Sequence, residues 1–107
     1  MTISFARFRI NIENMKFDKE SAAEAAIVDL AARLGISTDE IEVVGVTEKD
    51  FPDMSLGAAV PEEMAAQMIS TGWMIRLRAS GHDYEYRADK YQLRLVGFNG
   101  RNHIIRG

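Results

Sequence analysis

Apolar and polar residues alternate along the C-terminal half of the chain, which is the pattern of half-buried β-strands. Residues 73–79 alternate in this way and place Trp73, Ile75 and Leu77 on one face. Residues 84–88 repeat the alternation after a short turn that contains glycine. The two segments are therefore predicted to form a β-hairpin with those three side chains directed inward.

A second hairpin is predicted from the Asn99-Gly100 step. Both residues tolerate the positive φ that tight hairpin turns require, so this dipeptide is the strongest short-range hairpin signal in the chain. It would pair residues 93–98 with residues 101–105. Together the two hairpins predict a run of consecutive antiparallel strands.

A further strand is predicted at residues 41–48, which are rich in β-branched side chains. A loop over residues 49–60 follows, in which Pro, Asp, Ser and Gly supply turn chemistry. Residues 61–69 have two interpretations: Pro61 at a first helical position favours a short helix, but the segment could instead lead into the next strand. Residues 3–13 are predicted to be a strand, although a helical stripe of apolar residues also fits them.

The clearest helix prediction covers residues 21–34. Ser21 and Glu24 could form a capping box at its start, and Asp18 offers an alternative cap. Gly35 follows where a left-handed residue commonly ends a helix. One face of this helix carries apolar residues at helical spacing: Ala23, Ala26, Ile27, Leu30 and Leu34. The many alanines predict close packing of the helix against another element, a sheet.

These elements predict a single α+β domain over residues 1–107, with one main amphipathic helix packed on an antiparallel sheet of four to five strands. The chain of 107 residues is long enough for one core. It has no cysteine, and no apolar run approaches the roughly 18 residues that span a bilayer. The N-terminus lacks the basic-then-apolar order of a signal peptide. We therefore expect a cytoplasmic protein without membrane contact.

Charge is unevenly distributed, although the net charge is only −3. Residues 1–72 carry six Lys/Arg against thirteen Asp/Glu, a net charge of −7, and residues 73–107 carry seven against three, a net charge of +4. These charges could simply solvate two faces, or they could form a bipolar surface that orients a partner or a second copy. The overall acidity, and the placement of arginines and tyrosines on opposite strand faces, argue against nucleic-acid binding.

No residue pattern predicts a metal, a cofactor or a catalytic centre. The two histidines, His82 and His103, have no cysteine or suitably spaced third ligand with them. The glycines form no phosphate-binding loop, so no nucleotide cofactor is expected. Ser55 lacks the G-x-S-x-G context of a nucleophile, and Asp53 after Pro52 is better interpreted as the start of an Asx turn. The chain is therefore predicted not to be an enzyme.

Four short motifs occur together in this order: Leu34-Gly35-Ile36, Ile41-Glu42-Val43-Val44, Phe51-Pro52-Asp53-Met54-Ser55-Leu56-Gly57 and Tyr84-Glu85-Tyr86-Arg87. Over roughly residues 22–89 the chain resembles a small, uncharacterised bacterial domain that carries an aromatic-Pro-Asp-x-Ser-Leu-Gly loop. The resemblance implies a helix-on-sheet fold similar in outline to cystatins, and it implies no particular activity. Many look-alikes have Trp in place of Phe51 and cysteines near Ala58 and Ala65, so a loop that is cross-linked in them would not be cross-linked here.

The loop is the leading candidate for a binding site because its chemistry exceeds what a simple connection needs. We expect a non-enzymatic module that contacts a protein or peptide through residues 50–61. The predicted binding residues are Phe51, Asp53, Met54, Ser55 and Leu56. If the loop is instead a structural corner, Phe51 and Leu56 should be buried.

Other functions and assembly states stay open at this point. A protease-inhibitor-like protein is suggested by the cystatin-like outline, and a small enzyme could use Asp53 with Ser55. Exposed strand edges would allow either a monomer or a weak homodimer formed by sheet extension.

Overall fold

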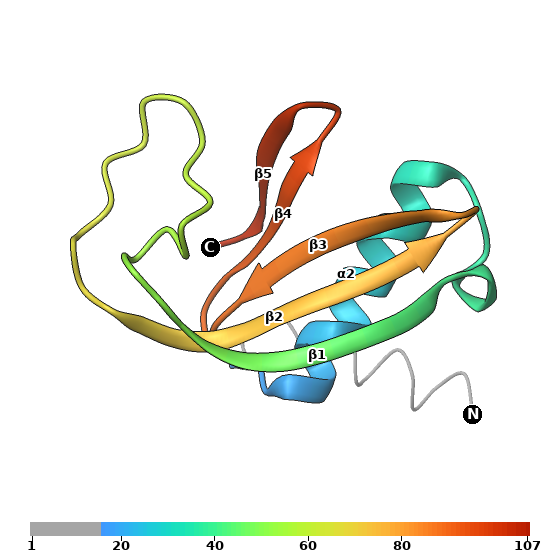
Figure 1. The fold of residues 1–107 in the computed structure, drawn as a ribbon, viewed down its shortest axis with the longest axis horizontal. Coiled ribbons are helices and arrows are strands. Elements are labelled where there is room, and N and C mark those ends of the chain that lie inside the picture. The colour runs from blue at the N-terminus through green and yellow to red at the C-terminus, as the bar shows by residue number, and fades with distance from the viewer. Residues whose placement is uncertain (1–15) are drawn as a thin grey trace, which may run out of the picture.

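The computed structural model describes residues 16–107, so the strand predicted within residues 3–13 lies outside the described residues. Five strands form one antiparallel sheet in the order β1-β2-β3-β4-β5, and each strand pairs with its neighbours along the chain. The bounds are β1 Glu42–Phe51, β2 Ser70–Ala79, β3 His82–Ala88, β4 Leu93–Phe98 and β5 Arg101–Arg106. This sheet and the helix packed on it confirm the predicted α+β fold (Figure 1).

Helix α2, Lys19–Leu34, covers one face of the sheet (Figure 1). It begins two residues before the predicted start because Asp18, the alternative cap, is the residue that caps it. The Asp18 carboxylate accepts from the Ser21 N–H at 2.8 Å, and the Ser21 hydroxyl accepts from the Asp18 N–H at 2.9 Å. The bonds from Ser21 lower the pKa of Asp18. Gly35 ends the helix at φ 69°, and the short 3-10 helix η1, Thr38–Glu40, leads to β1.

The main core lies between α2 and the sheet. Ala22, Ala26 and Leu30 are fully buried, and the two small side chains let the helix approach the strands closely. Inward residues of β2, β3 and β4 complete this core: Ile75, Leu77, Tyr86, Leu93 and Leu95. The Tyr86 hydroxyl donates to Asp29 of α2 at 2.8 Å, and burial together with this bond raises the pKa of Tyr86.

Near the predicted loop, one segment differs from expectation and another follows one of its two interpretations. Strand β1 continues to Phe51 because its last two residues pair with Thr71 and Ser70 of β2, so the loop starts later than predicted. Residues 61–69 form turns and irregular structure that lead into β2, which was the alternative to a short helix. Glu62 has a φ of 68°, a left-handed value that a right-handed helix does not contain.

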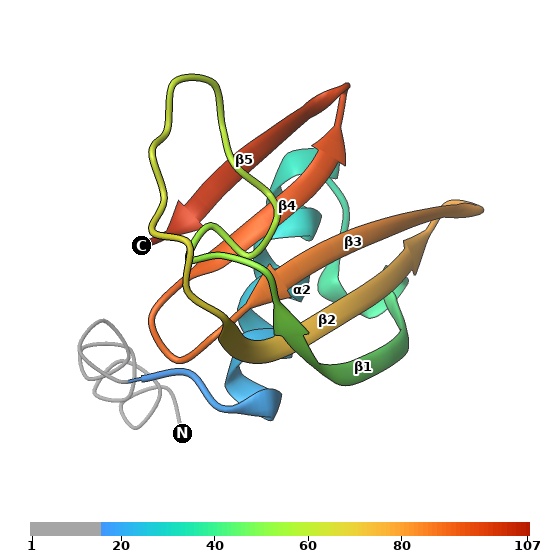
Figure 2. The ribbon, with the colours of Figure 1, turned by 60° about the vertical axis from the view of Figure 1, so that its left-hand side comes forward.

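Residues 52–69 connect β1 to β2, and we call this segment the strap. It lies on the face of the sheet opposite α2, because it bonds to polar side chains of β3, β4 and β5 that alternate with the core residues. In Figure 2 the strap, coloured green to yellow, runs past β4 and β5. The sheet is therefore covered by a helix on one face and in part by the strap on the other.

Replacing Leu30 with alanine tests the core under α2. We expect the variant to lose about 2–5 kcal/mol of unfolding free energy, because removing a fully buried leucine side chain leaves a cavity that its neighbours fill only in part. Urea denaturation followed by circular dichroism measures this loss. The matched control is Val28→Ala, at an exposed position of α2, which should change the free energy by at most about 0.5 kcal/mol. Equal losses in both variants would contradict the packing described.

Candidate functional site

The strap begins with a turn that the Asp53 carboxylate holds. Asp53 Oδ1 accepts hydrogen bonds from the Ser55 N–H at 2.9 Å, the Ser55 hydroxyl at 2.6 Å and the Gly57 N–H at 3.1 Å. Leu56 and Gly57 have positive φ values of 60° and 65°, which complete the tight turn. The bonds from Ser55 and Gly57 lower the pKa of Asp53. The interpretation of Asp53 as the start of an Asx turn is confirmed.

Beneath this turn, the strap buries a small apolar cluster against the sheet. Phe51, Leu56 and Ala58 are fully buried, and none of them belongs to the core under α2. Arg87 of β3 packs on this cluster, with its guanidinium carbon 5.6 Å from the centre of the Phe51 ring. Arg87 Nη1 also donates to the Leu56 and Gly57 carbonyls at 2.9 and 3.1 Å. These contacts make the first half of the strap a packed structural corner.

Burial divides the five predicted binding residues. The side chains of Phe51, Ser55 and Leu56 are buried, so they shape the strap and offer no surface to a partner while the strap stays in place. Asp53 is half-buried, and its carboxylate is engaged within the turn. Met54 is the member of the set that is exposed, at 37%.

Arg94 of β4 fastens the middle of the strap to the sheet. The residue is only 5% exposed, so its charge needs partners inside the protein. Nη1 and Nη2 donate to the two Glu63 carboxylate oxygens at 2.6 and 2.5 Å, and Nη1 also donates to the Ala58 carbonyl at 3.2 Å. The Val60 N–H donates to Glu63 at 3.1 Å. The bonds from Arg94 hold the pKa of Glu63 below its usual value.

A second set of bonds ties the start of the strap to the connection between β3 and β4. Gln92 Nε2 donates to the Met54 carbonyl at 2.7 Å, and Gln92 Oε1 accepts from Arg94 Nε at 2.8 Å. Asp89, which is 4% exposed, accepts from the Ser70 hydroxyl at 2.8 Å and from Gln92 Nε2 at 3.2 Å. The network therefore links the start of the strap, and Ser70 directly after its end, to the β3–β4 connection.

The sequence patterns did not identify Arg87, Asp89, Gln92 and Arg94 as strap anchors. In an alternating strand, Arg87 and Arg94 occupy positions that are expected to face solvent, so the pattern predicts exposed charges there. The one signal that pointed toward them is the charge asymmetry, because basic residues after position 72 can neutralise acidic residues before it. Glu63 with Arg94 is a pair of this kind.

The second half of the strap exposes large apolar side chains. Met64 is 97% exposed, Ile69 is 71% exposed and Met68 is 63% exposed. The Met54 N–H donates to the Ala66 carbonyl at 3.0 Å, so the two legs of the strap lie side by side near this point. We call Met54, Met64, Met68 and Ile69 the apolar strap residues. When large exposed apolar side chains form a contiguous patch, that patch is typical of an interaction surface.

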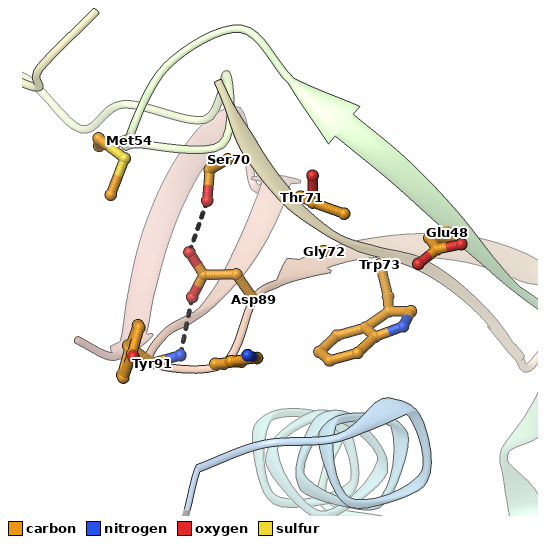
Figure 3. A pocket seen from close by; sticks show the side chains of 9 residues that line it. Glu48, Met54, Ser70, Thr71, Gly72, Trp73, Asp89 and Tyr91 are labelled. Carbon is orange, nitrogen blue, oxygen red and sulfur yellow. Dashed lines mark hydrogen bonds between the residues drawn. The ribbon is translucent and has the colours of Figure 1, made fainter. Parts of the chain in front are cut away.

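A cleft of about 420 Å³ opens where the strap joins the sheet (Figure 3). Trp73, which is half-buried instead of fully inward, lies on one side of it, and Tyr91 lies on the other. Asp89 stands between them, held by Ser70 as Figure 3 shows. Gly72 also lines the cleft, and a Cβ atom there would lie 2.0 Å from the Ala88 carbonyl oxygen, so a larger residue would displace β3.

Residues 16–107 lack two other kinds of feature. No three His, Asp or Glu side chains in that range gather closely enough to hold a metal ion. In the same residues, no helix has the length and apolar character needed to cross a membrane.

Replacing Glu63 with glutamine tests the ion pair by which Arg94 holds the strap on β4. The pKa of Glu63 is lowered in the folded protein. The ion pair with Arg94 therefore stabilises the fold fully above the ordinary glutamate pKa of about 4.3. This stabilisation is lost as the pH falls through the lower pKa of the folded protein. The Val60 N–H bonds to Glu63, and its NMR shift should titrate with a midpoint below about 4.3.

The same titration in Glu63→Gln should lose this transition, while Glu24→Gln at an exposed position of α2 should retain it. A midpoint at or above about 4.3, or an unchanged transition in Glu63→Gln, would contradict the ion pair.

Comparison with known proteins places the fold and the strap within a family. The model of a family described as a domain of unknown function, DUF8738, matches residues 23–96, which is more than half of the chain. No curated protein and no solved structure matches the chain. The likeness in outline to cystatins therefore stays a prediction. Because the match includes the whole strap and most of α2 and the sheet, the chain belongs to this DUF8738 family of domains of unknown function.

Proposed function

We propose that this domain is a non-enzymatic binding module that holds a protein or a peptide on its strap. The observation that carries the proposal is the exposure of Met64, Met68 and Ile69 on a segment that polar bonds hold against the sheet. Removing apolar area from water stabilises a complex by about 25 cal/mol per Å². Because the anchored strap is already ordered, a partner that covers these side chains faces a smaller entropic cost.

The proposed contact surface lies further along the strap than the sequence suggested. Phe51, Ser55 and Leu56 support the strap from beneath, and Asp53 sets its first turn. Met54 is the residue common to the predicted site and the apolar strap residues. Methionine adapts its shape to irregular partners, so a methionine-rich surface suits a peptide or a protein loop.

The alternative functions have less physical support. Ser55 is buried and its hydroxyl donates to Asp53, so the pair stabilises the turn and does not present a nucleophile to a substrate. A protease-inhibitor-like role rests on likeness of outline, and a fold by itself does not specify a function.

Peptide selection tests the proposal directly. A random-peptide display library is panned on the folded protein, and the affinity of each selected peptide is measured by fluorescence anisotropy. We expect the double variant Met64→Ser with Met68→Ser to lose at least about tenfold in affinity, because each covered methionine contributes on the order of 1 kcal/mol or more.

The matched control is Val28→Ser, which removes an apolar side chain of similar exposure from α2. It should leave the affinity unchanged. The proposal fails if no peptide is enriched on the folded protein. It also fails if the enriched peptides bind the double variant as well as they bind the original chain.

A further inference from the structure

The cleft at the base of the strap adjoins the apolar strap residues. Met54 belongs to both, since it is one of the exposed strap side chains and also lines the cleft. Ile69 is followed directly by Ser70, which lines the cleft as well. A chain that lies along this end of the strap therefore reaches the mouth of the cleft.

The aromatic residues of the cleft suit a positively charged group. Trp73 and Tyr91 stand on opposite sides of it (Figure 3), and the face of an aromatic ring attracts a cation. One such contact already involves a cleft residue, because the Lys16 ammonium lies 5.5 Å from the centre of the Tyr91 ring. A cation approaching Trp73 would find the same kind of attraction.

The carboxylates around the cleft add to this preference. Glu48 is exposed and lies directly opposite Trp73 in the pairing of β1 with β2. Asp89 is buried at the centre of the cleft wall, and its hydrogen-bond donors among the described residues are uncharged: a hydroxyl, a side-chain amide and backbone N–H groups. Its negative charge is therefore not neutralised by direct contact with a cation.

Two lysines of the protein itself also lie at the cleft. Lys90 lines the cleft, and Lys16 sits on Tyr91. The nearby carboxylates are those of Glu48 and Asp89, together with Asp50, which accepts from the cleft residue Thr71 at 2.7 Å. Of the residues that line the cleft, Glu48 and Asp89 are acidic and Lys90 is basic, so the lining itself carries a net charge of −1.

We propose that the cleft receives a lysine or arginine side chain of the segment that binds the strap. This inference rests on the proposed function and identifies its partner as a basic, amphipathic peptide segment. Apolar side chains of that segment cover Met68 and Ile69, and its cationic side chain enters between Trp73 and Tyr91. The carboxylates of Glu48 and Asp89 then supply the charge complementarity.

Trp73 makes this proposal measurable, because it is the only tryptophan of the chain and lies in the cleft. The probes are three synthetic peptides with the same leucine pattern, in which the polar positions are all lysine, all glutamate or all glutamine. We expect the lysine peptide to change the Trp73 fluorescence on binding and to bind more tightly than the other two. Its affinity should fall as salt concentration rises.

Variants of the cleft decide the sign of the charge preference. Glu48→Gln should lower the affinity of the protein for the lysine peptide by about fivefold, and Lys90→Met should raise that affinity by a similar factor. Tyr91→Leu should lower the affinity for the lysine peptide and leave the affinity for the glutamine peptide unchanged. The control for charge at a distance is Glu24→Gln on α2, which makes the same change in net charge and should leave the affinity unchanged.

Three results would overturn the cationic assignment. The first is equal weakening by Glu48→Gln and Glu24→Gln, which would mean non-specific attraction to an acidic protein. The second is tighter binding of the glutamate peptide, or weaker lysine-peptide binding in Lys90→Met. The third is a glutamine peptide that binds as tightly as the lysine peptide and loses affinity in the Met64→Ser, Met68→Ser variant. In that third case the strap still binds a partner, and only the charge of the partner was assigned wrongly.

Discussion

The need to neutralise Arg94 inside the protein is the constraint on which the outer face of the structure depends. An arginine that is only 5% exposed must find nearly all hydrogen-bond partners of its guanidinium group within the fold. It finds them in Glu63, the Ala58 carbonyl and Gln92, and two of these three belong to the strap. Meeting that need brings the middle of the strap onto β4.

The two faces of the sheet are covered by different kinds of interaction. On the α2 face, alanine and leucine side chains pack against apolar strand residues, and such contacts have little directional preference. On the strap face, most connections are hydrogen bonds from side chains to backbone carbonyls, including Asn102 to the Ala59 carbonyl at 2.9 Å. Hydrogen bonds need particular distances and angles, so they give the strap one defined path although it has no regular secondary structure.

The sequence predicted the regular part of the fold because local rules govern it. Alternation located the strands, Asn99-Gly100 located the last hairpin, and Gly35 located the end of α2. The limits of local rules are visible in the strap. Glu62 and Glu63 follow Pro61 as the acids of a first helical turn would, yet the pair formed by Glu63 with Arg94 joins residues 31 positions apart. Pattern reasoning on a single sequence does not detect a contact at that separation.

The candidate site also combines features that neighbouring residues determine with features that depend on distant contacts. Asp53 was correctly expected to hold a turn, because an Asx turn involves only neighbouring residues. The burial of Phe51 and Leu56 matches the structural-corner alternative, and it depends on Arg87, which is contributed by a distant strand. The cleft combines residues from β1, β2, the strap and the β3–β4 connection, so no single stretch of sequence predicts it.

The separation of these contacts along the chain also bears on the order in which the molecule forms. The hairpins β2–β3 and β4–β5 join residues that are close in sequence, and contacts of that kind form early because they close short loops. The bonds of Arg94 and Asn102 to the strap span 31 to 43 residues and need a completed sheet as their template. We therefore expect the strap to close last during folding. A segment that joins after the sheet is complete can change its sequence between relatives without interfering with the early steps that build the scaffold.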